Sequence, residues 1–285
     1  MDSKLNIRSY RDEDIKVLLE MTSEEGWSFS EIDCRASLKV DPEGLLVAED
    51  EIGMPIGFIG LFNMTSNITY VNVFIVQKDL RGKGIGKKLW EAMLKVTKGN
   101  TLVLDGVSQM KGWYEKRGFS FEAHSASSYH GTLSSQESVT LQNPYNIVSL
   151  SDDIWSALIA YDQQIYPYSR EHVLRAWFCG VDRYTAVAFL DESVVGYANL
   201  HWKSKKECNI RVLNADNDVI ADTLLLNLLQ HISLGSNVSF ILLEDKPISK
   251  YFSNFKISGT EHKLFTKEIT GIQTDKIIFH TGHTI

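Results

Sequence analysis

Apolar and polar positions alternate along the chain in two rhythms, one with the period of a helix and one with the period of a strand. Apolar side chains recur at helical spacing in residues 15–21, whereas residues 68–76 form an apolar run rich in β-branched side chains. In order, the first part of the chain predicts a strand at 5–8, helices at 15–21 and from 31 onward, strands at 45–49, 56–61 and 68–76, a helix at 86–96, a strand at 102–104 and a helix near 110–116.

The same order of elements recurs in the second part of the chain. A polar segment, Ser134-Ser135-Gln136-Glu137-Ser138, precedes the turn pair Asn143-Pro144 and separates the two parts. We therefore predict two α/β (α+β) domains in tandem, residues 1–134 and residues 143–285, each long enough to bury its own core. The second part predicts strands at 145–148, 186–190, 194–200, 209–213 and 238–243, and helices near 154–159, 170–178, 219–232 and 248–255.

Composition and charge narrow the range of partners. A net charge of −7 argues against nucleic acid and anionic membranes, and no apolar run approaches the roughly 18 residues that a spanning helix needs. Three scattered cysteines form neither a disulfide framework nor a zinc motif, and the eight histidines show no metal spacing. His280 falls near the end of the chain, where we expect a frayed tail. The N-terminus has no signal-peptide core, so we expect a cytoplasmic protein. The spacing of the histidines and cysteines leads us to expect no metal. A homodimer is compatible with the sequence.

The densest signal is a glycine-rich segment between the predicted strand 68–76 and the predicted helix 86–96. It reads Arg81-Gly82-Lys83-Gly84-Ile85-Gly86-Lys87-Lys88, with glycines at alternate positions. Glycine permits a tight turn and lets backbone amides approach a ligand closely. The N-terminus of a helix adds unpaired amides and partial positive charge. The segment therefore predicts a phosphate-binding loop.

Two other kinds of phosphate loop fit this segment poorly. A Walker loop requires Ser or Thr after Gly-Lys, but Gly86-Lys87 is followed by Lys88. The dinucleotide fingerprint requires Gly-x-Gly-x-x-Gly, and here the third glycine comes one position too early. A lone run of alternate glycines is more often a simple turn, but the strand before it and the helix after it favour a cofactor loop.

The loop resembles the Arg/Gln-x-x-Gly-x-Gly/Ala signature of the GCN5-related N-acetyltransferases at Arg81, Gly84 and Gly86. Downstream, Tyr114-Glu115-Lys116-Arg117-Gly118-Phe119 resembles the Tyr-x-x-x-Gly-Phe motif of the same family. The resemblance implies acetyl-CoA as co-substrate and a mixed, mostly antiparallel sheet flanked by helices. It also implies that the loop amides bind the pyrophosphate and that the preceding strand binds the pantetheine arm. The implied coenzyme-binding residues are Phe74, Ile75, Val76, Arg81, Gly82, Lys83, Gly84, Ile85, Gly86 and Lys87.

Three residues are candidates for catalysis. By resemblance, Tyr114 protonates the departing thiolate; the alternative is a tyrosine that only packs. An amine has a pKa near 10 and arrives mostly charged, so a base must take its proton. Glu25 is one candidate, because the neighbouring Trp27 would raise its pKa, and Asp105 at the end of an apolar strand is another. A solvated loop glutamate and a turn-forming aspartate are the alternatives for these two.

Further segments resemble a subgroup, the YitI-like proteins, in which an acetyltransferase domain precedes a diverged second domain. They are Glu25-Gly26-Trp27, Asp41-Pro42-Glu43-Gly44 and Leu104-Asp105-Gly106-Val107. In the second part, Leu213-Asn214-Ala215-Asp216-Asn217-Asp218 takes the place of the phosphate loop, and its two acids would repel a pyrophosphate. We therefore predict one coenzyme site, in the first domain, with the second domain helping to wall the acceptor pocket. Trp27, Phe29 and Trp113 are candidates for that pocket, although aromatic residues more often pack in a core.

These observations favour an N-acyltransferase that acts on a small-molecule amine or amino acid. A protein-lysine acetyltransferase is a second hypothesis, which would require an acidic groove for its substrate. A third is an acyl-CoA-binding sensor that has kept the loop but lost turnover.

Overall fold

The computed structural model describes residues 5–27, 29–97, 99–134 and 144–281. Most of the predicted boundary segment lies outside these residues. The first half contains β1 (Asn6–Ser9), α1 (Asp14–Glu24), α2 (Glu31–Val40), β2 (Leu45–Glu49), β3 (Pro55–Asn63), β4 (Ile68–Val76), α3 (Ile85–Val96), β5 (Thr101–Val107), α4 (Lys111–Glu115) and β6 (Phe121–Thr132). The second half contains β7 (Asn146–Ser149), α5 (Trp155–Ile165), α6 (Glu171–Phe178), β8 (Arg183–Leu190), β9 (Ser193–Ser204), β10 (Glu207–Ala215), α7 (Asp218–Gln230), β11 (Asn237–Leu243), β12 (Lys256–Phe265) and β13 (Ile277–Phe279).

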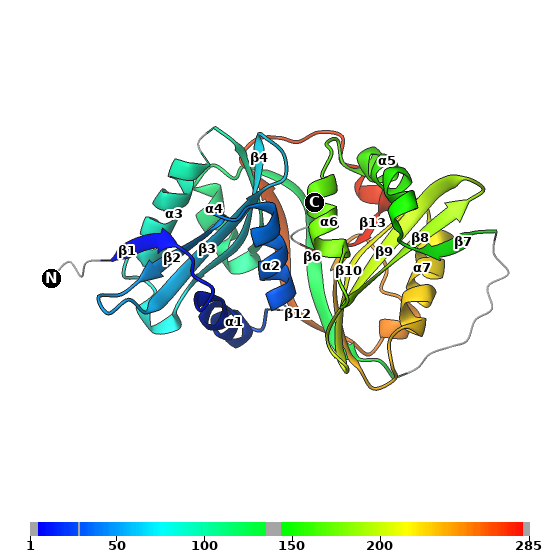
Figure 1. Cartoon of the computed structure of the whole chain (residues 1–285), viewed down its shortest axis with the longest axis horizontal. Coiled ribbons are helices and arrows are strands. Elements are labelled where there is room, and N and C mark those ends of the chain that lie inside the picture. Colours follow the sequence, from blue (N-terminus) through cyan, green and yellow to red (C-terminus); the bar gives the residue numbers. More distant parts are fainter. Residues whose placement is uncertain (1–4, 28, 98, 135–143, 282–285) are drawn as a thin grey trace.

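The described strands form one 13-stranded sheet that runs through both halves. Its order is β1-β2-β3-β4-β5-β12-β6-β11-β13-β10-β9-β8-β7. Most neighbours are antiparallel, but β4 pairs with β5 and β10 pairs with β11 in parallel. The two halves lie side by side, with β6 and β12 between them (Figure 1). The repeated parallel pair agrees with the repeated element order in the sequence.

The two halves exchange a strand with each other. In chain order β6 follows β5, but β6 pairs with β11 of the second half; β12 follows β11, but β12 pairs with β5 of the first half. The two exchanged strands also pair with each other. The division into residues 1–134 and 143–285 stays a prediction, and the structure adds that the sheet of each half is continued by the other.

Helices cover both faces of the sheet and bury an apolar core on each side. In the first half, α3 and α4 pack on one face through Leu89, Trp90 and Tyr114, whereas α1 and α2 pack on the other. In the second half, α7 covers one face and α5 with α6 covers the opposite one. This arrangement follows from strands that are apolar on both faces, which two helical layers must shield from water.

A polar contact joins α2 to the second half. Ser30 and Asp33 form a capping box at the start of α2, with Asp33 Oδ2 accepting from the Ser30 amide at 2.9 Å. Asp33 is fully buried and also accepts from Trp177 Nε1 of α6 and from the Arg211 guanidinium of β10. The cap therefore also fixes the position of the first half against the second.

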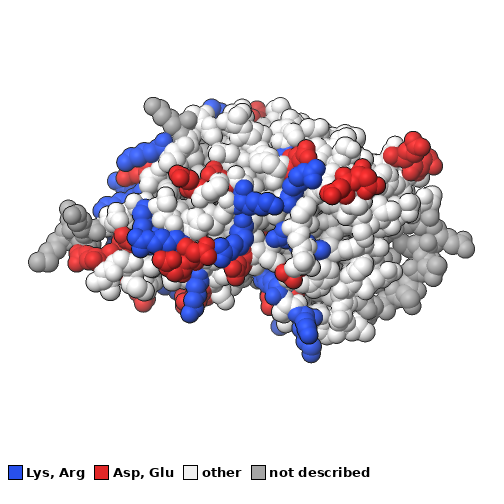
Figure 2. Space-filling model, viewed as in Figure 1, with Lys and Arg blue, Asp and Glu red and all other residues white. Residues whose placement is uncertain are grey.

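Several predicted elements need correction. The helix expected at 248–255 is a single 3-10 turn, Lys250–Phe252. Phe252 and Phe255 are both buried in the core, and this tertiary packing overrides the local helix propensity. The sequence also did not predict β6, β12 or β13. Within the described residues, no helix has both the length and the apolar character that a membrane crossing requires. On the face shown in Figure 2, basic side chains mix with acidic ones over the first half.

Candidate functional site

The site begins where β4 and β5 separate. Their parallel pairing runs from Ile68 opposite Thr101 to Val71 opposite Leu104. At the next residue, Asn72, β4 has a β-bulge, because Gly60 of β3 pairs with Val73 and Leu61 pairs with Val71. A bulge bends its strand and increases the local twist. The rest of β4 stays paired with β3 as far as Val76, so its other edge faces a gap next to β5.

The glycine loop closes one end of this gap. Gly82 and Gly84 have φ values of 77° and 85°, which side chains rarely adopt, and a Cβ built on either would meet nothing within 4 Å. Gly84 is the N-cap of α3 and offers no side chain to the first-turn amides. These amides have no partner within the helix and point out of its end. The loop is thus an open cradle of N–H donors at a positive helix terminus.

Gly86 has a different role from the other two glycines. A Cβ at this position would lie 3.2 Å from the Phe74 ring, so the missing side chain lets α3 pack closely on β4. Among the predicted coenzyme residues, all but Lys83 line the adjoining cavity. The Lys83 side chain is exposed and does not line the cavity, and the predicted contact through its backbone amide stays a prediction.

Glu25 forms ion pairs with the glycine loop through Arg81 and Lys78. It does not have the raised pKa that the sequence predicts for a general base. Its Oε1 accepts from Arg81 at 2.8 Å and lies 3.4 Å from Lys78 Nζ. Partial burial would raise the pKa of this carboxyl, but the bonds to Arg81 and Lys78 outweigh it and lower the pKa. The expected effect of Trp27 is therefore wrong. The Arg81 guanidinium also donates to the Val76 carbonyl, at 3.0 Å, so it holds the shape of the loop.

Tyr114 lies on the face of the sheet that α3 and α4 cover. Its ring packs 5.9 Å from the rings of Trp90 and Phe119, and it fits against β5 because Gly106 has no side chain. Burial raises the pKa of Tyr114 to about 12, so its hydroxyl keeps its proton at neutral pH. Tyr114 also lines the cavity. It can therefore donate a proton on this side of the gap.

Asp105 points to the opposite face of β5. Its Oδ2 accepts from the Tyr70 hydroxyl at 2.6 Å and from Lys263 Nζ at 2.7 Å. Burial, the largest single influence, raises the pKa of Asp105, but the charge of Lys263 and the hydrogen bonds from Lys263 and Tyr70 together outweigh it and lower the pKa. A carboxylate held in this way is a weak proton acceptor at neutral pH. The residue is also inside β5 and is not in a turn.

Sequence reasoning missed the second half's contribution to this polar cluster. Glu261 and Lys263 lie on β12 opposite Val107 and Asp105, and His280 Nε2 lies 3.5 Å from Glu261 Oε1. His280 is fully buried, so the expected frayed tail is wrong at this position; Gly282 and His283 lie outside the described residues. Ligand-type atoms of Asp105, Glu261 and His280 all lie within 4.8 Å of one another. Because Lys263 already supplies a positive charge, we assign no metal to the cluster.

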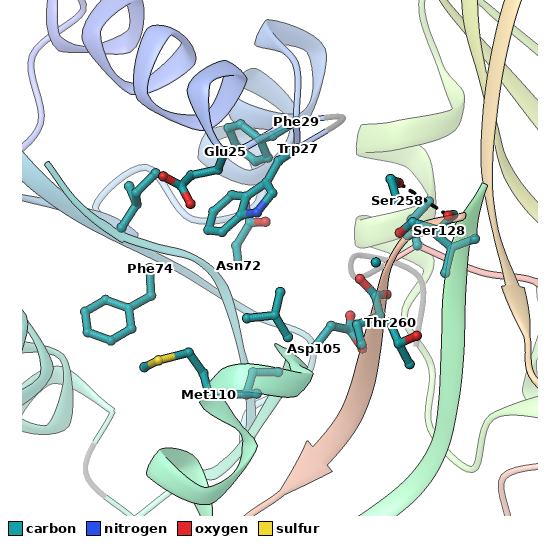
Figure 3. Close-up of a pocket in the computed structure, with 18 of the residues that line it drawn as sticks. Glu25, Trp27, Phe29, Asn72, Phe74, Asp105, Met110, Ser128, Ser258 and Thr260 are labelled. Atoms are coloured by element: carbon teal, nitrogen blue, oxygen red, sulfur yellow. Dashed lines mark hydrogen bonds between the residues drawn. The ribbon is translucent and has the colours of Figure 1, made fainter. Parts of the chain in front are cut away.

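A cavity of about 1670 Å³ joins these parts. This is larger than a typical pocket for one drug-sized ligand, roughly 300–1,000 Å³, and suits two substrates together. In Figure 3, Trp27 and Asn72 lie on one side, Ser128 and Thr260 lie on the other, and Asp105 lies between them. Trp27, Phe29 and Trp113, the aromatic candidates from the sequence, all line the cavity.

The equivalent place in the second half is closed. A bulge at Arg211 of β10 corresponds to the bulge at Asn72, but here β13 lies between β10 and β11. The Asn217 side chain caps α7 by accepting from the Ile220 amide at 3.0 Å, so it occupies the place where a phosphate would bind. These features agree with the prediction of a single coenzyme site in the first half.

Comparisons with known proteins point to one fold. The model of the acetyltransferase (GNAT) domain family matches residues 41–121. The chain is similar to the holothin acyltransferase of Pseudoalteromonas sp. (strain SANK 73390), at 24% identity over 80% of this chain and 75% of that protein.

Solved structures extend the likeness to both halves. A protein of Pyrococcus horikoshii, described as a candidate acetyltransferase, superimposes with a TM-score of 0.78 at 18% identity, covering 98% of this chain and 95% of the other. A tandem GNAT protein from the clavulanic acid biosynthesis pathway gives 0.63 at 13% identity, covering 93% and 99%. The predicted fold class, two such domains in tandem, is confirmed.

Proposed function

This chain belongs to the GCN5-related N-acetyltransferase superfamily and has two domains of that fold, and on this premise we propose that it transfers an acetyl group from acetyl-CoA to the amine nitrogen of a small molecule or an amino acid. Acyl transfer in general follows from the family. The observation that carries the finer proposal is the open cradle of amides at Gly82–Gly84 and the start of α3, placed at the end of a gap between two strands.

The backbone of the first half fits this co-substrate. The diphosphate would lie on the amides between Gly82 and Lys87, where the helix terminus favours an anion. The pantetheine arm would follow the unpaired edge of β4 between Phe74 and Val76, in the way that an extended peptide adds to a sheet edge. Bound acetyl-CoA would supply an activated thioester, and a strand amide beside the gap would stabilise charge on the carbonyl oxygen.

The two faces of β5 suit the two proton transfers of the reaction. Tyr114, on the face of α3 and α4, can give a proton to a departing thiolate. The cluster around Asp105 lies on the opposite face, where an amine can approach. Because the gap joins the two faces, the nucleophile and the leaving group can occupy opposite sides of one carbonyl carbon. This geometry supports direct attack without a covalent enzyme intermediate.

The cavity favours a small acceptor over a peptide lysine. The far wall comes from β10 and β11, where Asn209 and Arg211 are buried in the junction of the two halves. A protein substrate would need to insert its lysine between the halves. A non-catalytic sensor would not require Tyr114 at the gap.

Release of free thiol from acetyl-CoA, measured with a panel of acceptors, tests the proposal. The panel should contain spermidine, tyramine, lysine, glutamate and glucosamine, together with lysine-containing peptides. Turnover with a free amine supports the proposal, whereas turnover with peptides alone favours a protein-lysine acetyltransferase. Saturable coenzyme binding in calorimetry with no turnover on any acceptor would favour the sensor and overturn the proposal.

A further inference from the structure

The exchanged strand β12 brings a carboxyl group of the second half to the wall of the first half's cavity. Glu261 of β12 lies opposite Val107 of β5 and Ala126 of β6, and it lines the cavity. It is two residue pairs along from the Lys263–Asp105 pair and therefore on the same face, since side chains on a strand alternate. Glu261 therefore stands on the side of the gap opposite to Tyr114.

Glu261 differs from the other two carboxyls near the gap in its hydrogen bonds. Glu25 accepts from Arg81, and Asp105 accepts from both Tyr70 and Lys263. In the described residues, Glu261 Oε1 accepts no hydrogen bond, since His280 Nε2, 3.5 Å away, forms none either, and the Glu261 side chain is only 18% exposed. A buried acceptor oxygen without a donor is a rare feature that calls for a partner. An amine in the cavity would provide one.

The titratable groups around Glu261 come from several strands. Tyr70 of β4, Asp105 of β5, Lys263 of β12 and His280 after β13 interact with Glu261. His124 of β6 pairs with Lys263, and its ring packs 5.0 Å from the ring of His280. Burial lowers the pKa of both histidines, to about 4 for His124, so they are neutral at physiological pH. Asp105 and Lys263 largely compensate each other as an ion pair. In the described part of this cluster, Glu261 is thus a carboxyl group with an oxygen that accepts no hydrogen bond.

We propose that Glu261 is the general base that takes the proton from the acceptor amine, so that the second half completes the catalytic centre of the first. The inference rests on the proposed function. The Glu261 carboxylate accepts one proton from the acceptor's ammonium group. The nitrogen lone pair then forms the C–N bond to the acetyl carbon, and the C–S bond breaks with its electron pair going to sulfur. Tyr114 protonates that sulfur and regains a proton, through solvent, from the new amide nitrogen; Glu261 releases its proton to solvent.

The electrostatic setting supports this role. Burial, and next to it the negative charge of Asp105, raise the pKa of Glu261 to about 8, while Lys263 partly offsets them. A base with a pKa near the working pH accepts a proton from an amine more readily than an ordinary carboxylate does. Turnover should therefore rise with pH up to about 8 and then level off.

Glu261→Gln is the test, because glutamine keeps the shape of glutamate and cannot accept the proton. With acetyl-CoA and the best free amine of the panel, we expect kcat at pH 8 to fall roughly 100-fold. Coenzyme affinity in calorimetry should stay within about twofold, and the rise of kcat/KM with pH should disappear. Glu261→Asp should keep that rise at a lower rate. Glu268→Gln, an exposed position just beyond β12, is the matched control and should behave like the wild type.

Each other outcome counts against the assignment. If Glu261→Gln keeps the wild-type rate and pH profile, the inference fails alone and the proposed function stands. If the variant loses coenzyme affinity in proportion to its rate, Glu261 is structural. Loss of wild-type turnover in EDTA would assign the cluster to a metal ion instead. A wild type that is inactive with every acceptor overturns the proposed function and this inference with it.

Discussion

Replacing Gly84 with glutamate changes the phosphate cradle in both shape and charge. Gly84 has a φ of 85°, and an L-residue in this region is strained by roughly 1–2 kcal/mol. The new carboxylate would also face the diphosphate. At about 6 Å and an effective dielectric constant of about 40, Coulomb's law gives about 1.4 kcal/mol of repulsion for each phosphate charge. Two such charges amount to about 2.8 kcal/mol, or a loss of about 100-fold in coenzyme affinity.

Calorimetry of coenzyme A binding can separate the two contributions. Gly84→Ala carries the backbone strain without the charge and should weaken binding less than about tenfold. Gly53→Glu is the control, because it introduces the same charge and the same backbone strain away from the loop. Gly53 has a φ of 83° and equally open surroundings in the turn between β2 and β3. This variant should bind as the wild type does. The loss of coenzyme A affinity in Gly84→Glu should become smaller in 0.5 M salt, because counterions screen exposed charges within several ångströms.

Two results would refute this reasoning. Wild-type affinity in Gly84→Glu would show that no phosphate lies at the start of α3. An equal loss in Gly84→Ala, with no dependence on salt, would show that the loop matters only for its shape.

Three further predictions concern the two faces of β5. Tyr114→Phe should lower kcat at least tenfold with little change in coenzyme affinity; equal losses in rate and binding would reduce Tyr114 to a packing role. Lys263→Met should lower the free energy of unfolding, measured in urea, by about 3–5 kcal/mol, because the buried Asp105 carboxylate loses its counter-ion. The double variant Lys263→Met, Asp105→Asn should recover most of this free energy. Since folding raises the pKa of Glu261 from 4.5 to about 8, the folded state holds the extra proton, and wild-type stability falls as pH rises through this window. Glu261→Gln should therefore gain in Tm relative to the wild type between pH 4.5 and 8, and a pH-independent difference would contradict the burial of this charge.

The parts of the site that depend on local geometry could be predicted from the sequence. Gly82 and Gly84 adopt positive φ because the chain turns from β4 into α3 within a few residues, and only glycine does this without strain. The Ser30–Asp33 cap likewise needs only one helical turn. Such features involve residues that are close in sequence, so their pattern is visible before the fold is known.

The features that depend on distant partners could not be predicted. Glu25 lies 56 positions from Arg81, and nothing in the sequence shows that the two will pair and lower the pKa of the carboxyl. The exchanged strands β6 and β12 carry many polar side chains, because they line a cavity in the middle of the sheet. They therefore lack the apolar run that identifies the other strands, so the sequence pattern indicates neither these two strands nor Glu261.

The exchange of β6 and β12 also determines when the sheet beside β5 can be completed during synthesis. A ribosome makes the glycine loop and Asp105 early, but Lys263 follows 158 residues later. Until residues 256–265 emerge, the outer edge of β5 has no neighbour and the buried carboxylate has no counter-ion. A nascent chain can thus form the glycine loop before the sheet beside β5 is complete. Under the function proposed above, acetyl-CoA would be consumed only by chains that have been extended through β12.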